Sequence, residues 1–280
     1  MKLVQKIAIT YIRTRLSILA AFSKRKAAAE AFELFCTPAK QPRIPLSPLF
    51  LEAEPLSLTI EGITLAGFRW NKGGGRRLQI VHGYESASQK FEIYIQAFIQ
   101  KGYEVLVFDA PAHGLSGGKQ ITLPLYIDAL REVYRQYGPV QSFFAHSFGG
   151  LALVHFLETI TPDTSARVAL VAPATETSTA IDGLFKQLHL GPEVRKEFDG
   201  IVRGKSNADP GYYSISRAID HIKMPVLWIH DRHDTITPLA DVQPIIGRNN
   251  PQLRFLITDG FGHRRIYREE SVVNAVTDFL

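Results

Sequence analysis

Residues 140–150 read VQSFFAHSFGG, and this stretch decides the fold class. An apolar run ends in the pattern small-x-Ser-x-Gly and passes at once into a segment of helical length. A sharp strand-to-helix turn of this kind needs small neighbours, and it exposes the hydroxyl of the central serine. We therefore predict that Ser147 is a nucleophile and that the Phe148 amide, at a helix N-terminus, is an oxyanion donor.

Short apolar runs alternate with helical segments on both sides of that turn. Near-continuous apolar runs are typical of strands buried on both faces of a parallel sheet, and two runs at 56–60 and 63–70 indicate an antiparallel pair at its edge. The sequence therefore predicts an α/β fold with a mostly parallel, eight-stranded sheet flanked by helices. The remaining expected strands are 78–81, 105–108, 140–144, 168–171, 226–229 and 253–257, and the expected helices are 89–100, 123–137, 149–159 and 266–280.

The residues that follow these runs carry the chemistry, because ligands of open α/β sheets bind beyond the carboxyl ends of the strands. Tyr84 follows the third run, and its backbone N–H is expected to complete an oxyanion hole with Phe148. Asp234 and His263 follow the last two runs. A serine hydroxyl is a weak nucleophile until a histidine oriented by a carboxylate takes its proton. The order Ser147, Asp234, His263 therefore predicts a catalytic triad.

Residues 56–280 resemble the α/β-hydrolase superfamily, as a member similar to serine esterases and lipases. Residues 108–116, FDAPAHGLS, are similar to its Asp-x-Pro-Gly-His-Gly-x-Ser segment, with Ala112 in place of the usual glycine. The resemblance implies that Ser147 is the nucleophile, that Asp234 is the acid in an Asp-x-x-x-Pro loop and that His263 is the base. It also implies a small helical cap, at about residues 177–220, and an ester hydrolase that needs no cofactor.

Several alternatives stay open at this point. Asp231 competes with Asp234 for the acid role, although only Asp234 has the Asp-x-x-x-Pro spacing. The cluster around residues 230–234 could instead bind a metal, but neighbouring loop residues point apart, so we expect no metal site. The same triad would also serve an acyltransferase or a thioesterase. The alternative from another class is a ligand-binding protein that retains the fold without catalysis.

Three further residues are expected to contact the substrate, a small-molecule ester or another acyl compound. His146 occupies the variable position before the predicted nucleophile. Phe185 and Leu188 are three residues apart in the expected cap, which places them on one side of a helix. We expect these two side chains to line an acyl pocket and to set chain-length preference.

The positive charge of the chain is concentrated at its N-terminus. Of the 32 Lys and Arg residues, seven lie in residues 1–35 beside two acidic residues, and the remainder is balanced at 25 to 25. The main body therefore gives no indication of a nucleic-acid partner. Residues 1–55 are expected to form an amphipathic helix followed by a proline-rich connector at 38–55, ahead of the hydrolase domain at 56–280.

The N-terminal helix could serve in two ways. We expect it to pack on its own domain in a cytoplasmic protein, and the alternative is peripheral contact with an anionic membrane through residues 1–35. Its longest uncharged run, 16–23, is far shorter than a membrane span needs, and the basic cluster at 24–26 argues against a cleaved secretory signal. The lone cysteine, Cys36, excludes an intrachain disulfide. Nothing in the sequence indicates an oligomeric state.

Overall fold

The structure, a computed structural model, describes residues 3–39, 45–161 and 165–280 and divides the chain into two compact units. We call Pro38–Thr175 with Ile215–Leu280 the sheet unit, and Met1–Thr37 with Glu176–Ser214 the helical unit. Residues 1–2 and 40–44 of the expected N-terminal segment lie outside the described residues.

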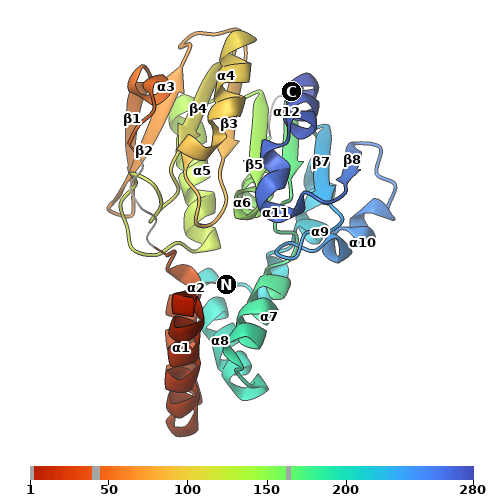
Figure 1. The fold of residues 1–280 in the computed structure, drawn as a ribbon. Coiled ribbons are helices and arrows are strands. Elements are labelled where there is room, and N and C mark those ends of the chain that lie inside the picture. Colours follow the sequence, from red (N-terminus) through yellow and green to blue (C-terminus); the bar gives the residue numbers. More distant parts are fainter. Residues whose placement is uncertain (1–2, 40–44, 162–164) are drawn as a thin grey trace. The chain divides into compact units, whose positions relative to one another are not determined.

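The sheet unit is built on one eight-stranded sheet with the strand order β1-β2-β4-β3-β5-β6-β7-β8 (Figure 1). Strand β2 pairs antiparallel with both β1 and β4, and all other pairs are parallel. The predicted mostly parallel sheet and its antiparallel edge are confirmed. The strands are β1 (Glu54–Ile60), β2 (Ile63–Trp70), β3 (Arg77–Val81), β4 (Glu104–Phe108), β5 (Ser142–His146), β6 (Arg167–Val171), β7 (Val226–Asp231) and β8 (Leu253–Thr258).

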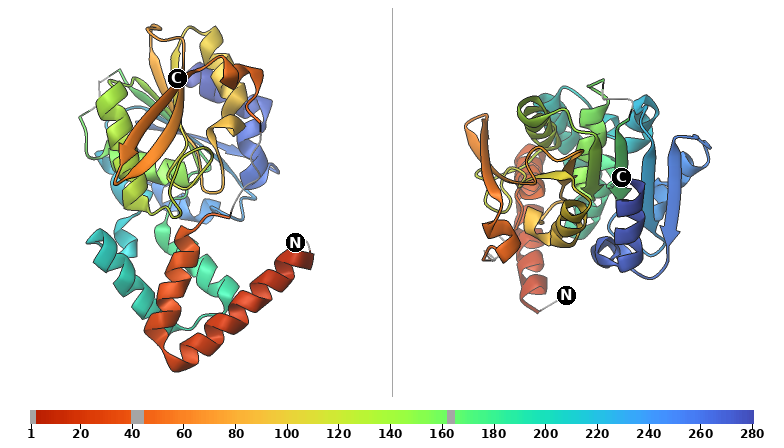
Figure 2. Two further views of the ribbon diagram at one scale, coloured as in Figure 1. Left: turned by 90° about the vertical axis from the view of Figure 1, so that its left-hand side faces the viewer. Right: turned by 90° about the horizontal axis from the view of Figure 1, so that it is seen from above.

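Helices cover both faces of this sheet (Figure 2, right). Helices α4 (Glu92–Gln100) and α12 (Glu270–Phe279) pack together on one face, where their apolar side chains join those of the strands in a continuous core. Helices α5 (Leu123–Tyr137) and α6 (Phe148–Leu157) pack together on the other face. The shorter elements are α3 (Pro48–Leu51), α9 (Ile215–Ala218), α10 (Gln243–Ile246), α11 (Gly262–Arg265) and 3-10 turns at Ser88–Phe91, Ile219–His221, Leu239–Asp241 and Ile266–Arg268.

The strand order positions the candidate site. Strand β3 lies between β4 and β5, so the direction in which strands are added reverses at β3. Such a reversal opens a crevice beyond the carboxyl ends of the two strands that diverge from it. Because Val81 pairs with Ala145, the loop after β3 and the turn after β5 emerge side by side.

The helical unit joins two segments that are far apart in the chain. Its helices are α1 (Leu3–Phe22), α2 (Lys24–Cys36), α7 (Thr177–Leu188) and α8 (Pro192–Ser206), followed by a 3-10 turn at Pro210–Tyr212. Helices α2 and α8 pack against each other, and α1 contacts α2 and α7. Its core consists of Ala27, Ala28, Ala31, Phe32, Cys36, Ile181, Phe185, Val194 and Phe198.

The N-terminal segment differs from the prediction in two respects. It forms two helices because Ser23 ends the first one and caps the second, where its hydroxyl accepts the Lys26 N–H at 3.3 Å. It also belongs to one unit with residues 176–214 rather than standing apart as an N-terminal segment. Among the described residues, no helix is both long and apolar enough to cross a membrane.

Candidate active site

Ser147 lies on a strained turn between β5 and α6. Its backbone has φ +56° and ψ −127°, a conformation that a residue with a side chain adopts only when its surroundings impose it. Hydrogen bonds hold the turn, since the Ser147 amide donates to the Val171 carbonyl at 3.2 Å and the Ser147 carbonyl accepts the Ala174 N–H at 3.0 Å. These hydrogen bonds therefore keep the strained turn, and with it the hydroxyl, in one place at the end of the sheet.

Two glycines permit the close packing around that turn. A Cβ at Gly83 would lie 2.8 Å from the Cβ of Ser147, and one at Gly149 would lie 2.4 Å from the carbonyl oxygen of His82. Only residues without a side chain allow the loop after β3 to approach the turn so closely. The motif therefore requires a glycine at position 149 because a side chain there would clash with the loop after β3.

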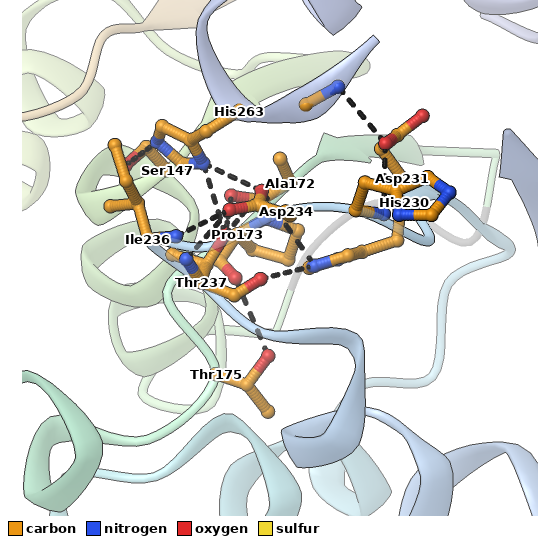
Figure 3. Close-up of polar contacts among 12 residues, drawn as sticks. Ser147, Ala172, Pro173, Thr175, His230, Asp231, Asp234, Ile236, Thr237 and His263 are labelled. Carbon is orange, nitrogen blue, oxygen red and sulfur yellow. Dashed lines mark hydrogen bonds and ion pairs between the residues drawn. The ribbon is translucent and has the colours of Figure 1, made fainter. Parts of the chain in front are cut away.

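The structure brings the three predicted triad residues together (Figure 3). His263 Nε2 lies 2.9 Å from Ser147 Oγ, and His263 Nδ1 lies 2.7 Å from Asp234 Oδ2. An ionised carboxylate only accepts hydrogen bonds, so the short contact to Asp234 places the ring proton on Nδ1. The free lone pair of Nε2 then faces the serine hydroxyl. This is the geometry of a nucleophile, a base and a carboxylate that orients the base.

The environment of Asp234 keeps its side chain charged. Burial by itself would raise the pKa of this carboxyl, but the hydrogen bond and the charge of His263 and the amides of Thr237 and Ile236 outweigh burial and lower the pKa. Both amides donate to Asp234 Oδ1 at 2.8 Å. The carboxylate is therefore fixed in place and available to stabilise a positively charged His263.

Thr237 is a member of this site that the sequence reasoning missed. Its hydroxyl lies 2.8 Å from Asp234 Oδ2 and 3.0 Å from His263 Nδ1, and 3.3 Å from the carbonyl oxygen of Ala172 (Figure 3). An aspartate that binds amides two and three residues ahead forms a compact turn, and this local signal could have marked Thr237. The Thr237 hydroxyl therefore contacts the predicted acid, the predicted base and the backbone that follows β6.

Asp231 has a different role from Asp234. It is fully buried at the end of β7, where its carboxylate accepts hydrogen bonds from the amides of Phe261 and Gly262 at 3.0 and 2.9 Å. It also accepts the Thr258 hydroxyl at 2.8 Å and the His233 amide at 3.0 Å. Burial alone would raise the pKa of Asp231, but these four donors lower it. Asp231 therefore holds the loop that carries His263.

His230 fixes the other side of the same loop. Its Nε2 donates to the Thr237 carbonyl at 2.6 Å, which sets the ring tautomer and fixes the backbone beside Asp234. Burial is the main cause of its lowered pKa, so the ring stays neutral. The residues considered as a metal cluster thus have separate partners, and no three metal-ligating side chains converge anywhere in the described part of the chain.

The two residues predicted to supply the oxyanion donors lie next to each other. Phe148 is the first residue of α6, so no carbonyl within that helix accepts its amide. Tyr84 follows Gly83, which is in van der Waals proximity to Ser147, and the rings of Tyr84 and Phe148 meet edge to face at 6.2 Å. The pair lies at the correct end of the sheet, and its role as an oxyanion hole stays a prediction.

His146 is buried behind the triad. Its ring lies 4.9 Å from the ring of His263 and 4.5 Å from that of Tyr267, and its Nε2 lies 3.3 Å from the His263 carbonyl oxygen. Burial, together with the nearby charge of His263, lowers the pKa of His146 to about 3. His146 therefore packs as a neutral ring against the base, and the predicted contact with substrate stays a prediction.

Phe185 and Leu188 are buried in the helical unit. The Phe185 ring meets that of Phe198 edge to face at 5.3 Å, and the Arg195 guanidinium lies 5.4 Å from its centre. Leu188 is buried on the same helix. These contacts account for Phe185 as a core residue of the helical unit. The role of both side chains in lining a pocket stays a prediction.

A protein family model and a curated protein match this chain. A family model described as serine aminopeptidase, S33, matches residues 76–197, a range that contains Ser147. The lysophosphatidylserine lipase ABHD12 of Danio rerio is 21% identical over 212 residues, which are 71% of this chain and 55% of that protein. The chain thus spans about half the length of this curated relative.

Solved structures show the same fold over most of the chain. The esterase Pf2001 of Pyrococcus furiosus is 23% identical with a TM-score of 0.66, and the match covers 88% of this chain and 97% of that one. The mouse α/β hydrolase domain-containing protein 10 is 19% identical with a TM-score of 0.60, and the match covers 81% and 96% of the two chains. At these identities the likeness concerns the fold.

Proposed function

We propose that this chain, a member of the α/β-hydrolase superfamily, is a serine hydrolase that cleaves carboxylic esters through an acyl-enzyme on Ser147. The observation that carries the proposal is the unbroken series of contacts from Asp234 through His263 to Ser147, at 2.7 and 2.9 Å. The names of the relatives, a lipase and an esterase, support the same class of reaction.

The first half of the reaction forms the acyl-enzyme. His263 Nε2 takes the proton of Ser147 Oγ as the oxygen attacks the ester carbonyl carbon, and the carbonyl oxygen becomes an oxyanion. The amides of Phe148 and Tyr84 are the donors that we assign to this oxyanion. The bond to the alcohol then breaks, and His263 returns the proton to the leaving alkoxide. Asp234 stabilises the imidazolium that exists between the two proton transfers.

The second half releases the acid. A water molecule gives its proton to His263 Nε2 and attacks the acyl carbon, and collapse of the second tetrahedral intermediate returns that proton to Ser147 Oγ. The enzyme recovers its starting state and the product is a carboxylic acid. An alcohol or a thiol in place of water would give transferase chemistry on the same residues, and a thioester in place of the ester would give a thioesterase.

An active-site-directed probe tests the nucleophile without knowledge of the substrate. We expect a fluorophosphonate to label the wild-type protein at Ser147 and to leave Ser147→Ala unlabelled, because only an activated serine reacts readily with such reagents. Ser271→Ala, which removes an exposed serine of α12, is the matched control and should label like wild type. No labelling of Ser147 in folded protein would contradict the proposal.

A substrate panel tests the bond that is cleaved. We expect p-nitrophenyl esters of graded chain length to be hydrolysed, and aminoacyl p-nitroanilides, which report the aminopeptidase activity in the name of the matching family model, to be hydrolysed far more slowly. Preferential cleavage of the anilides, or of thioesters over the matched oxygen esters, would overturn the ester assignment while leaving the triad in place.

A further inference from the structure

Helix α1 presents an apolar surface to solvent that the helical unit does not use. Four of its large side chains are exposed, namely Ile7 (62%), Tyr11 (65%), Ile18 (57%) and Phe22 (86%). At 100° per residue these positions fall within an arc of about 60° along the whole helix. We call these four residues the α1 stripe.

The helix already packs on its own unit through a different face. Leu16 is fully buried and lies about 150° around the helix from the middle of the α1 stripe. On the packed side the Arg13 Nε donates to the Gln187 carbonyl at 2.6 Å, and α1 contacts α2 and α7. The α1 stripe is therefore not required for the packing of the helix within its unit.

The charge around the α1 stripe indicates which partner it fits. Residues 1–26 contain seven Lys or Arg and no Asp or Glu. The stripe ends at Phe22, directly before the cluster Lys24, Arg25 and Lys26. Arg15 pairs with Glu30 and Lys24 pairs with Glu193. Arg25 and Lys26 are exposed and have no ion pair with any residue that the structure describes. A suitable partner should therefore have a negatively charged surface that the cations can contact and an apolar layer below that surface that can bury the stripe.

From these observations we propose that α1 docks on an anionic lipid bilayer, with the α1 stripe buried at the level of the headgroups. An amphipathic helix lying in the interface combines an apolar face with nearby cations, here Arg25 and Lys26 at the end of the stripe. A tyrosine within the face suits a boundary between apolar and wet surroundings. Helix α1 does not qualify as a membrane span, so it lies on the bilayer. A symmetric contact between two copies would bring a second set of the unpaired cations Arg25 and Lys26 to the same interface, which disfavours that occupant.

Flotation with vesicles tests the proposal on the full-length protein. We expect the protein to float with vesicles of phosphatidylcholine and phosphatidylserine in equal parts, and to float far less with phosphatidylcholine alone. Binding should weaken as salt is raised, because the attraction between cations and an anionic surface is screened. Absence of flotation with the anionic vesicles at low salt would overturn the proposal.

Two sets of variants locate the contact. Ile18→Ser with Phe22→Ser should weaken partitioning by roughly tenfold or more for each side chain removed. The control is Leu51→Ser, which removes an equally exposed (70%) apolar side chain from the sheet unit and should float like wild type. The double variant Arg25→Gln, Lys26→Gln should bind anionic vesicles about fivefold more weakly for each charge removed. The double variant Lys119→Gln, Arg254→Gln loses the same charge from the sheet unit and is the control, which should bind like wild type.

Tryptophan fluorescence and the oligomeric state in solution complete the test. Both native tryptophans, Trp70 and Trp228, are buried, so the emission of a Phe22→Trp variant reports mainly on the stripe. We expect a blue shift on addition of anionic vesicles. Equal flotation of the Ile18 and Phe22 variant and wild type would overturn the proposal. So would a dimer in solution that this variant converts to a monomer, since a second copy would then cover the stripe. Turnover of a water-soluble ester, measured without vesicles, should be unchanged.

Discussion

The sheet unit and the helical unit present their side chains in different ways. In the sheet unit Ser147, Asp234 and His263 each lie one to five positions beyond the end of a strand, and the backbone turn at that point fixes the direction of the side chain. In the helical unit the core forms between α2 and α8, whose residues are more than 150 positions apart in the chain. Local motifs therefore predict the first unit, whereas the second depends on a pairing that no local pattern encodes. The following predictions test this difference.

The largest effects belong to the base and the nucleophile of the sheet unit. Ser147→Ala and His263→Ala should each lower kcat/KM for an ester on the order of a millionfold, and the double variant should lose little more, because the residues act as one unit. Steady-state kinetics on the same p-nitrophenyl ester measure this. His221→Ala, which removes an exposed histidine of the sheet unit, should retain full activity. Losses that multiply in the double variant would contradict a shared mechanism.

The two aspartates of the β7 loop should respond differently to loss of charge. Asp234→Asn should lower kcat on the order of 10⁴-fold in a protein that still folds, because an amide can hold the wrong tautomer of His263. Asp231→Asn should destabilise the fold by about 1 to 3 kcal/mol, since its new NH₂ would face N–H donors. Its activity should fall only on the order of 10- to 100-fold, through displacement of His263. If Asp231→Asn is the more damaging to kcat, the assignment of the acid is wrong.

These two residues also show where prediction from the sequence stops. Ser147, Asp234 and His263 could be placed because each belongs to a short pattern with one steric or chemical meaning. The positioning role of Asp231 and the contacts of Thr237 depend on which loop lies opposite, so a single segment does not reveal them. The break at Ser23 was missed although serine is a preferred N-cap, because helix formers on both sides hide the signal.

In the helical unit we expect loss of packing rather than loss of chemistry. Phe185→Ala should destabilise this unit by about 3 to 5 kcal/mol, as expected for removal of a buried ring. Hydrogen exchange should increase in α2, α7 and α8 and stay unchanged in the sheet unit. Phe22→Ala, which removes an exposed ring from the same unit, is the control and should have little effect. A changed chain-length preference without faster exchange would instead restore Phe185 as a pocket residue.

Acid should weaken the sheet unit first. Burial, followed by neighbouring charge, lowers the pKa of His146 to about 3 and that of His113 to about 4, whereas an unfolded histidine titrates near about 6.5. Between these values the unfolded chain binds more protons, so stability falls as pH falls, by about 1.4 kcal/mol per pH unit for each histidine. The one histidine of the helical unit, His189, is exposed.

Hydrogen exchange at about pH 7 and about pH 5 measures this difference between the units. We expect the opening free energy to fall in the sheet unit and to change little in the helical unit, which contains no buried histidine. Equal sensitivity of both units over this interval would contradict the assignment of buried, neutral histidines to the sheet unit.

The smallest effect concerns a position at which the sequence departs from the superfamily segment that it resembles. Ala112 has φ +63°, a left-handed conformation that favours glycine. Ala112→Gly should therefore stabilise the sheet unit by about 0.5 to 1 kcal/mol. Urea unfolding checks this, with Ala29→Gly on the exposed face of α2 as a control expected to lose about 1 kcal/mol. Equal losses at both positions would show that the strain at Ala112 is already relieved.

The central claim is that Ser147 carries the acyl group during turnover, and a rapid acid quench tests it most directly. Wild-type protein mixed with a p-nitrophenyl ester and quenched within the first turnovers should gain the mass of one acyl group, on the peptide that contains Ser147. The same experiment with Ser147→Ala should give no gain. Ester hydrolysis by wild type with no adduct at any quench time, or with the adduct on another residue, would contradict the account.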